Sequence, residues 1–257
     1  MQERIIREHN KRIIEQFSKQ AATFENIQGH YSSVDDIIAL SGVTKQMRVL
    51  DLACGTGITT CKFAKAAKEV AGLDITKEML YQAQLKCHSE KLTNINFKLG
   101  DVENLQYEDE SFDIVFTRYG FHHFLDVKKV FDEMLRVCKR GGRIIVVDVA
   151  LEKRYEKAFN EMERLRDPSH TRALTKEEFE GLFANDRLSK RRTGSYKVEV
   201  ELEEQLKASF PNKGDDGKIR EILQDDLTSN RLGVNSHVIE GKIYFSYPIS
   251  IFWADRK

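Results

Sequence analysis

The sequence of 257 residues lacks the features that identify a membrane or secreted protein. Its uninterrupted apolar runs reach only four residues, as in Ile144–Val147, whereas a membrane-spanning helix needs about 20. Residues 1–15 mix both charge signs and contain no apolar stretch of the roughly 7–15 residues that a secretory signal requires. We therefore expect a protein of the cytoplasm that has no membrane partner.

Cysteine and proline are scarce, and neither sign of charge is in excess. The four cysteines form no Cys-x-x-Cys pair, which argues against a zinc site or a disulfide framework. Lys+Arg and Asp+Glu each number 41, so no net charge attracts nucleic acid. With three prolines, no repeat and no low-complexity tract, the sequence gives no sign of a linker. We expect one domain over residues 1–257.

The central part of the chain alternates short apolar runs with helical stretches of about 12–15 residues, which is typical of βαβ units. Helices are predicted near residues 59–67, 77–90 and 127–139. The predicted strands between them are Arg48–Leu52, Val70–Leu73, Ile95–Leu99, Phe112–Thr117 and Arg143–Val149. These crossovers imply an α/β fold with a Rossmann-like, doubly wound and mostly parallel sheet, whose ligands lie at the carboxyl ends of the strands.

The flanking segments predict the rest of the sheet and a helical lid. Amphipathic helices are expected at residues 3–18, 33–41, 152–166, 175–183, 202–210 and 218–227. A strand at 189–200 and a final run after the turn Glu240-Gly241 would complete a seven-stranded sheet whose last strand is antiparallel. We expect a core of about 41–150, 185–200 and 237–257, and a lid of 1–40, 151–184 and 201–236.

The motif VLDLACGTG, residues 49–57, runs from an apolar strand through a glycine turn into a helix. Gly55 and Gly57 permit positive φ and allow backbone N–H groups to approach a ligand. The turn lacks the third glycine of a dinucleotide fingerprint, and Asp51 in the strand would repel a pyrophosphate. Both features disfavour a nicotinamide-dependent dehydrogenase.

Two further acidic residues follow the next two strands. Asp74 is placed to hold the hydroxyls of a ribose, and Asp101 could accept a hydrogen bond from an adenine amine. Each alone is as often a helix cap or part of a solvated loop, but three carboxylates at strand ends favour a nucleotide. A ligand with adenosine, an amino group and no phosphate fits best, and S-adenosylmethionine has these features.

These motifs resemble those of the class I S-adenosylmethionine-dependent methyltransferases, in the UbiE-like (type 11) group. VLDLACGTG is similar to the first motif of the family, and LDIT to its ribose-binding strand end. GDVENLQYEDESFDIVFTRYGFHHF is similar to the adenine loop and fourth strand, and MLRVCKRGGRIIVVD to the fifth. The resemblance covers about residues 10–185. It implies an enzyme that transfers a methyl group to a small-molecule acceptor by in-line displacement, without a metal.

The resemblance also implies which residues hold S-adenosylmethionine. Its methionine end would contact Asp51, Gly55, Thr56 and Gly57, and its ribose Asp74 and Ile75. Asp101 and Val102 would flank the adenine, and Arg118 would border the pocket. Tyr31 and Phe24 could close over the cofactor, although packing is the simpler role for both.

The acceptor pocket is expected where the fourth and fifth predicted strands end, formed by His123 and Asp148. Asp148 closes the fifth predicted strand and is a candidate to position or deprotonate the acceptor, and a cap for the following helix is the alternative. His122 and His123 both follow the fourth strand, and adjacent residues point differently, so at most one should face the site. A histidine suits a general base, but packing is as frequent a role. We expect residues 166–172 to roof the pocket, with His170 as a second catalytic candidate and arginines that could orient a carboxylated acceptor. A plain surface loop is the alternative.

Two functions from other classes remain open. A nucleic-acid methyltransferase is disfavoured by the neutral charge, by the absence of a PPY tetrad and by the position of Cys138 in a predicted helix. The only tight basic cluster is Lys190-Arg191-Arg192, which is more often a solvated strand start. A non-catalytic scaffold that binds S-adenosylmethionine has the same motifs. The identity of the acceptor and the oligomeric state are not encoded in these patterns.

Overall fold

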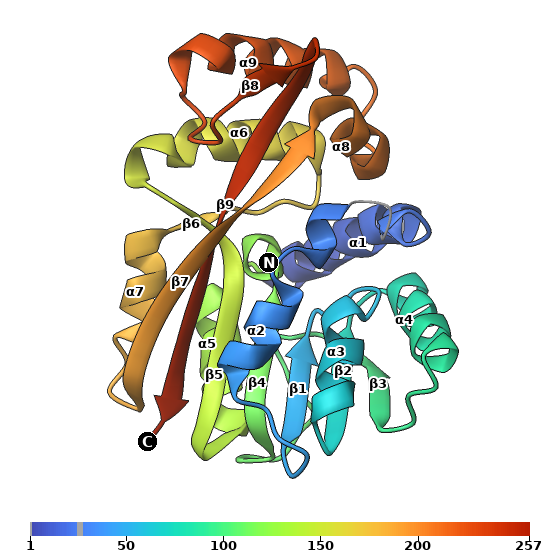
Figure 1. Cartoon of the computed structure of the whole chain (residues 1–257), viewed down its shortest axis with the longest axis vertical. Helices are drawn as coiled ribbons and strands as arrows, with labels where there is room; N and C mark the ends of the chain where they lie inside the picture. The colour runs from blue at the N-terminus through green and yellow to red at the C-terminus, as the bar shows by residue number, and fades with distance from the viewer. Residues whose placement is uncertain (1, 25–27) are drawn as a thin grey trace.

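The computed structural model describes residues 2–24 and 28–257. Its central sheet has the strand order β3-β2-β1-β4-β5-β9-β7 (Figure 1). The first five strands are β1 (Arg48–Leu52), β2 (Glu69–Asp74), β3 (Ile95–Leu99), β4 (Phe112–Arg118) and β5 (Cys138–Leu151). Every pair among them is parallel, which confirms the predicted doubly wound arrangement.

The end of the chain completes the sheet in the opposite direction. Strand β9 (Lys242–Arg256) lies antiparallel between β5 and β7 (Leu188–Glu201). It forms a hairpin with β8 (His237–Ile239) through Glu240 and Gly241, which both have positive φ. The antiparallel last strand is therefore confirmed. Within the described residues the sheet has nine strands rather than the predicted seven, because β6 (Leu174–Thr175) pairs with β5 and β8 pairs with β9 beside the seven strands of the main path.

The sheet separates two hydrophobic cores. Alternate residues of the strands point to opposite faces, so Val49 and Phe116 lie in one core, and Leu50 and Val115 in the other. The first core includes α2 (Val34–Ser41) and α3 (Ile58–Ala66), and the second includes α5 (Val127–Val137) and α7 (Lys176–Phe183). Coverage of both faces explains why the parallel strands read as nearly continuous apolar runs.

The remaining helices lie at an edge of the sheet or beyond the carboxyl ends of its parallel strands. Helix α4 (Lys77–Ser89) packs beside β3, and α1 (Gln2–Gln20) lies above α3 and α4 in Figure 1. Helices α6 (Glu156–Arg166), α8 (Leu202–Ser209) and α9 (Asp215–Ser229) lie at the top of the same view. Three short 3₁₀ turns are η2 (Gln28–Tyr31), η3 (Phe121–His123) and η4 (Lys153–Tyr155).

Strand β5 differs from its prediction. It begins at Cys138 rather than at Arg143, and it ends at Leu151 rather than at Val149. The extension at the carboxyl end has a tertiary cause, because Ala150 and Leu151 pair with the short strand β6 (Leu174–Thr175), which was not predicted. Asp148 therefore lies inside β5 opposite Ser250, and not at the carboxyl end of the strand.

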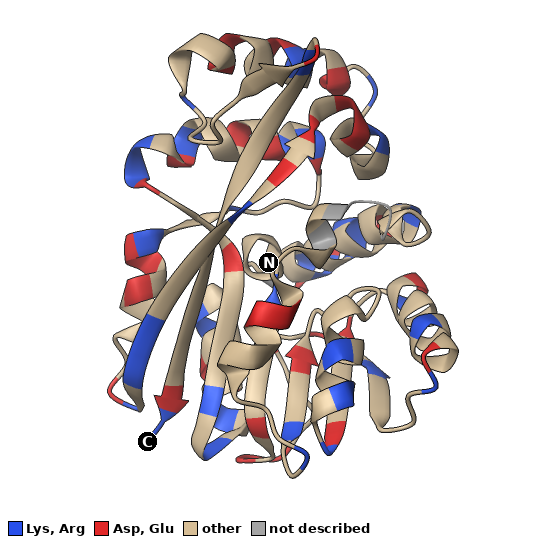
Figure 2. Ribbon diagram, in the orientation of Figure 1, with Lys and Arg blue, Asp and Glu red and all other residues tan. Residues whose placement is uncertain are grey.

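Charged residues of both signs are spread over the molecule. Figure 2 shows Lys and Arg interleaved with Asp and Glu along α6 and α9. Among residues 2–24 and 28–257, no helix is long and apolar enough to cross a membrane.

Candidate active site

Two cavities adjoin where the parallel strands end. The first, with about 1020 Å³ of empty volume, is lined by the ends of β1, β2 and β4, the turn after β3 and helix α1. The second, with about 800 Å³, is lined by η3, β5, α6, β7, α8 and β9. We call them the sheet cavity and the lid cavity. Their linings share Phe17, Phe24, Tyr119 and His123, so the two spaces meet at these side chains.

The glycine turn after β1 shapes the floor of the sheet cavity. Ala53, Gly55 and Gly57 all have positive φ, and α3 starts directly after Gly57. A Cβ on Gly57 would lie 2.9 Å from the Cβ of Ala83 in α4, whereas one on Gly55 would meet no atom within 4 Å. Gly55 therefore opens to the sheet cavity. Gly57, which is not among the lining residues, allows α3 to pack closely on α4.

Asp74 ties the end of β2 to this turn. Its Oδ2 accepts a hydrogen bond from the N–H of Gly55 at 2.8 Å, and its Oδ1 accepts one from the N–H of Thr76 at 2.8 Å. Burial raises the pKa of Asp74, and these backbone donors oppose the rise. Each carboxylate oxygen can accept a second hydrogen bond, so the group can still bind hydroxyls. Ile75 lines the cavity beside it.

Asp51 gives the sheet cavity a buried acidic group. It is only 2% exposed, and its Oδ2 accepts a hydrogen bond from Thr60 Oγ1 at 2.6 Å. Burial raises the pKa of Asp51 to about 7, with a further rise from Asp74. A cation bound nearby would stabilise the ionised carboxylate. The ammonium and sulfonium groups of S-adenosylmethionine supply such charge.

A second observation also fits a polar ligand here. The hydroxyl of Thr56 lines the sheet cavity, is buried, and has no hydrogen-bond partner among the described residues. Buried hydroxyls in native proteins are nearly always paired, so a bound molecule would complete this one. Together, Asp51 and Thr56 fit the methionine end of S-adenosylmethionine.

Helix α1 closes the sheet cavity over the third strand. Asn10 donates from Nδ2 to Asp101 Oδ2 at 2.8 Å, and the N–H of Glu103 donates to Asp101 Oδ1 at 2.9 Å. Asp101 and Val102 both line the cavity, as expected of residues that would flank an adenine. His9, also in α1, forms a 2.7 Å hydrogen bond from Nε2 to the carbonyl of His123.

The end of β4 and the residue after it contribute a cation, Arg118, and an aromatic ring, Tyr119, to the cavity linings. Arg118 lines the sheet cavity, donates to the carbonyl of Ser32 at 3.1 Å and lies 4.2 Å from the centre of the Tyr119 ring. The hydroxyls of Tyr119 and Tyr196 are 2.9 Å apart. Tyr31 is 42% exposed and accepts a hydrogen bond from Lys86 Nζ at 3.1 Å. Tyr31 is not among the described residues that line the two cavities.

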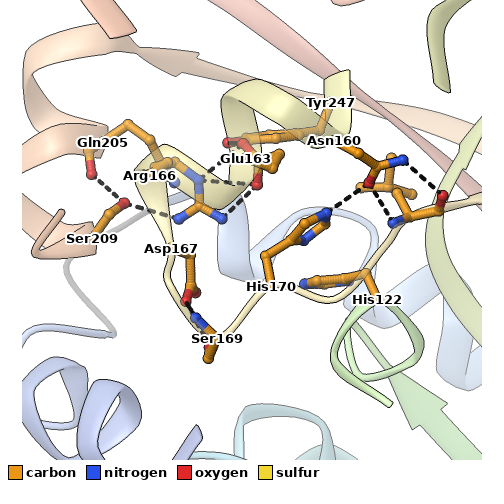
Figure 3. A network of polar contacts seen from close by, with 12 residues as sticks. His122, Asn160, Glu163, Arg166, Asp167, Ser169, His170, Gln205, Ser209 and Tyr247 are labelled. Atoms are coloured by element: carbon orange, nitrogen blue, oxygen red, sulfur yellow. Dashed lines mark hydrogen bonds and ion pairs between the residues drawn. The ribbon is translucent and has the colours of Figure 1, made fainter. Parts of the chain in front are cut away.

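The lid cavity combines an apolar wall with a buried polar network. The network is shown in Figure 3: Arg166 donates to both carboxylate oxygens of Glu163 and, at 2.9 Å, to Ser209 Oγ. Tyr247 donates to the same Glu163 at 3.0 Å. The apolar wall comprises Val149, Phe159, Ala173, Val198, Val200 and Ile249.

The pairing of the two arginines weakens one expectation from the sequence. The side chains of Arg166 and Glu163 are 12% and 4% exposed, so the cation is already neutralised inside the cavity wall. Arg172 pairs with Glu156 at 3.1 Å and with Glu178 at 2.7 Å, and it does not line the cavity. These pairs do not favour a carboxylated acceptor. The wall suits a largely apolar molecule with few polar groups.

His123 lies at the junction of the two cavities. Its Nδ1 is 3.1 Å from the carbonyl oxygen of Ser169, to which it can donate only as an N–H. Its own carbonyl accepts from His9 and, at 3.0 Å, from the hydroxyl of Thr171. Burial, together with the adjacent His122, lowers the pKa of His123 to about 4. The ring is therefore neutral at neutral pH.

His170 is held in one tautomer by Asn160. The amide nitrogen of Asn160 donates to the carbonyls of Glu156 at 2.8 Å and Ala173 at 3.3 Å, and its Oδ1 accepts from the N–H of Ala173 at 2.7 Å. His170 Nε2, 2.7 Å from that Oδ1, must then carry the hydrogen. Its Nδ1 is buried without a partner among the described residues, and burial lowers the pKa of His170.

Sequence reasoning named both His122 and His123 and chose His123 for the site. Both His122 and His123 line the lid cavity, contrary to the expectation that at most one would face the site. The reason is local, because η3 is a 3₁₀ turn with about three residues per turn, not an extended strand. His122 Nδ1 lies 2.6 Å from Asp148 Oδ1. The sequence feature that could have indicated this contact is the aspartate in the fifth predicted strand, which follows the His-His pair along the chain. That feature does not reveal which of the two histidines contacts the aspartate.

Comparisons with known proteins agree with this geometry. A family model described as a methyltransferase domain matches residues 43–212. The methyltransferase YcgJ of Bacillus subtilis is 31% identical over 195 residues, which are 74% of this chain and 77% of YcgJ. The demethylmenaquinone methyltransferase of Paenarthrobacter aurescens is 30% identical over 154 residues, and the match spans 54% of this chain and 58% of that relative.

Solved structures extend the likeness beyond these sequence matches. The crystal structure of YcgJ superposes with a TM-score of 0.80 at 28% identity, covering 88% of this chain and 98% of YcgJ. A methyltransferase structure from Bacillus halodurans gives a TM-score of 0.80 at 22% identity, over 87% and 98% of the two chains, and shows the shared fold. The chain belongs to the methyltransferase-domain family and is a class I S-adenosylmethionine-dependent methyltransferase of the UbiE-like type.

Proposed function

We propose that the enzyme transfers the methyl group of S-adenosylmethionine to a small molecule bound in the lid cavity. The observation that carries this proposal is the shared lining of Phe17, Phe24, Tyr119 and His123. A donor in the sheet cavity and an acceptor in the lid cavity would meet there. In-line displacement requires that the reacting atoms approach to roughly 3–3.5 Å in a space that excludes water.

The side chains at the strand ends would hold the cofactor. Asp51 and Thr56, with the opened backbone at Gly55, would bind its methionine end. Asp74 and Ile75 would bind the ribose, Asp101 and Val102 the adenine, and Arg118 would border the pocket. When bound, S-adenosylmethionine supplies a methyl group activated by a positively charged sulfur. Gly57 contributes through the shape of the turn, and Tyr31 has no part in this assignment because it lies outside both linings.

The segments outside the sheet would act as a lid. Helix α1 contributes His9, Asn10 and Ile13 to the sheet cavity, and Gln20 to the lid cavity. Helices α6 and α8 add the buried polar network. We therefore assign residues 1–40, 151–184 and 201–236 to a lid that excludes water, and about 41–150, 185–200 and 237–257 to the core of one methyltransferase domain. Residues 1 and 25–27 of this lid lie outside the described residues.

The lid cavity favours a particular kind of acceptor. Its wall is mainly aliphatic and aromatic, and its arginine is paired with Glu163, so it suits an apolar molecule without a negative charge. Relatives of this chain are named demethylmenaquinone methyltransferases, which makes a reduced quinone a reasonable first acceptor to test. A nucleic acid would need an accessible basic surface, which the apolar wall and the paired arginine of this cavity do not provide.

The experiment is a transfer assay with methyl-labelled S-adenosylmethionine and the full chain. Reduced demethylmenaquinone, duplex DNA and transfer RNA are offered in separate reactions, and label is expected in the organic extract. Label in nucleic acid would contradict the proposal. Binding of S-adenosylhomocysteine by calorimetry with no transfer to any acceptor would instead indicate a scaffold.

A matched pair of variants tests the location. Val198 is 6% exposed and lines the lid cavity, so Val198→Phe should narrow it and lower transfer without weakening the binding of S-adenosylhomocysteine. Val238 is 54% exposed and does not line either cavity, so Val238→Phe is the control. Full transfer by Val198→Phe would place the acceptor elsewhere.

A further inference from the structure

We propose that His122, held by Asp148, is the base that removes a proton from the methyl acceptor. The inference rests on the proposed function, because it concerns the molecule bound in the lid cavity. It also names the chemical class of that molecule: a neutral, largely apolar acceptor whose nucleophile forms when a hydroxyl loses its proton. Sequence reasoning placed this role on His123 or His170, and the hydrogen bonds of the three rings separate them.

The hydrogen bonds around Asp148 determine which nitrogen of His122 carries a hydrogen. Asp148 is 1% exposed, and its carboxylate accepts from the N–H groups of Phe121 at 2.8 Å and Val149 at 2.7 Å. Since the carboxylate acts as an acceptor, His122 Nδ1 is the donor in their 2.6 Å contact. Nε2 lies on the opposite side of the ring and makes no hydrogen bond to a described residue. A ring oriented in this way presents a lone pair on Nε2 when it is neutral.

The electrostatic surroundings favour His122 over its neighbours as a base. Burial alone would lower the pKa of His122, but the Asp148 carboxylate raises it above the ordinary value, with help from Glu163 and against Arg166. The pKa values of His123 and His170 are lowered by burial, and each lies next to other histidines. A base whose pKa is far below the working pH holds a proton poorly, and of the three rings only His122 has a pKa that is raised rather than lowered.

Two residues that line the lid cavity, His122 and His170, each carry a nitrogen lone pair without a hydrogen-bond partner among the described residues. The lone pairs lie on His122 Nε2 in its neutral form and on His170 Nδ1, whose tautomer is fixed by Asn160. The centres of these two rings are 5.5 Å apart. Two acceptor atoms in one apolar space select a ligand that donates hydrogen bonds, which supports an acceptor with hydroxyl groups.

The step balances as follows. The O–H bond of the acceptor breaks, and its proton forms an N–H bond with the lone pair of His122 Nε2. The electron pair left on the acceptor oxygen, or on a ring carbon conjugated with it, forms the bond to the methyl carbon. The bond between that carbon and sulfur breaks, its electron pair stays on sulfur, and S-adenosylhomocysteine leaves. Asp148 stabilises the imidazolium that results. Where the ring carbon is methylated, its C–H bond then breaks, that proton leaves to solvent, and the oxygen takes a proton back, which restores the aromatic ring.

The first test needs no acceptor and measures the histidine rings by NMR in the full chain with nitrogen-labelled histidine. Neutral His122 should carry its hydrogen on Nδ1, and its pKa should lie above about 6.5. Asp148→Asn should lower this pKa below about 6.5. The exposed ring of His88 is the internal control. A hydrogen on Nε2, or a pKa of His122 below that of free histidine, would overturn the proposal.

The second test measures turnover with reduced demethylmenaquinone as the probe acceptor. His122→Asn should lower kcat roughly 100-fold or more and abolish the rise of rate with pH. Asp148→Asn should shift that rise to lower pH, and the affinity for S-adenosylhomocysteine should change less than about twofold in both variants. His88→Asn is the matched control. Unchanged kcat and pH profile in His122→Asn would overturn the proposal, whereas no turnover by the wild type would count against the acceptor of the proposed function and leave the NMR result to decide His122.

Discussion

The two cavities are built in different ways. The sheet cavity takes most of its polar groups from positions at or just after the ends of consecutive strands, so each βαβ unit adds a part of it. The lid cavity draws its wall from α1, η3, β5, α6, β7, α8 and β9, which extend over nearly the whole chain. The first cavity therefore follows from local sequence, whereas the second exists only when the entire chain is folded.

The cavities also bury opposite kinds of titratable group. Burial raises the pKa of Asp51 in the sheet cavity to about 7, while burial lowers that of His123 at the junction to about 4. Asp51 binds a proton more readily in the folded chain, and His123 binds one less readily. Their contributions to stability therefore change with pH in opposite directions between about pH 4 and pH 6.5.

The largest expected effect is the pH dependence of stability that Asp51 causes. Its folded pKa, about 7, lies above the value of 3.8 in the unfolded chain, so its contribution is present below pH 3.8 and is lost as the pH rises through 7. The loss amounts to about 4 kcal/mol at 1.36 kcal/mol per pKa unit. Asp51→Asn removes this dependence, so the free energy of unfolding of the ligand-free variant should exceed that of the wild type by more at pH 8 than at pH 5.

The measurement is urea unfolding of both proteins across this pH range. Asp36 is exposed, so Asp36→Asn should leave the pH dependence as it is in the wild type. The same slope in Asp51→Asn and wild type would show that the buried carboxyl does not carry the effect. It would also remove the reason to expect a cation beside Asp51.

The second effect has the opposite sign and belongs to His123. Its folded pKa, about 4, lies below the ordinary 6.5, so its contribution is present above pH 6.5 and is lost as the pH falls through 4. The expected loss is about 3 kcal/mol. His123→Gln cannot titrate, so its free energy of unfolding should decline less than that of the wild type on acidification. The exposed His88→Gln is the control, and an identical acid profile in His123→Gln would contradict the burial of a neutral ring.

The difference between the cavities explains which parts of the fold and of the site could be predicted from the sequence. Apolar runs, glycine turns and acidic strand ends are local signals, and they located β1 to β4 and the carboxylates Asp51, Asp74 and Asp101. The hairpin at Glu240-Gly241 was equally local. Each of these features depends on residues that are close in sequence, where steric and hydrogen-bonding preferences act directly.

The errors arose where distant segments meet. Strand β5 extends past Val149 because Ala150 and Leu151 pair with β6, a two-residue strand that no pattern in the sequence indicates. Tyr31 has an aromatic side chain of the kind that could cover a cofactor, but it contacts Lys86 instead. The sequence did not separate His122 from His123, because the contact of His122 Nδ1 with Asp148 Oδ1 joins η3 to β5 only in the folded chain. Tertiary context, which a pattern does not contain, decided all three.

A smaller effect concerns the affinity of the sheet cavity for S-adenosylhomocysteine. Asp74→Ala removes a charged hydrogen-bond acceptor for the ribose, so the affinity for S-adenosylhomocysteine should fall by about 1.5–3 kcal/mol, or roughly 10- to 150-fold. The variant also frees the N–H groups of Gly55 and Thr76, so its thermal stability should be measured alongside. Tyr247→Phe removes a hydrogen bond in the lid cavity and is the matched control for calorimetry. Equal losses in both variants would show that the cavities do not bind their ligands separately.

The smallest effect tests whether α1 belongs to the sheet cavity. Asn10 lines it and donates to Asp101 Oδ2 at 2.8 Å, which fixes the carboxylate that would face the adenine. Asn10→Ala should weaken the binding of S-adenosylhomocysteine by about 1 kcal/mol, or roughly fivefold, because the loss is one side-chain hydrogen bond. Lys11 is exposed on the same helix and pairs with Glu15 at 3.6 Å, so Lys11→Ala should leave the affinity unchanged. The same affinity in Asn10→Ala would mean that α1 covers the cavity without shaping it, and a loss in both variants would point to the stability of the helix as the cause.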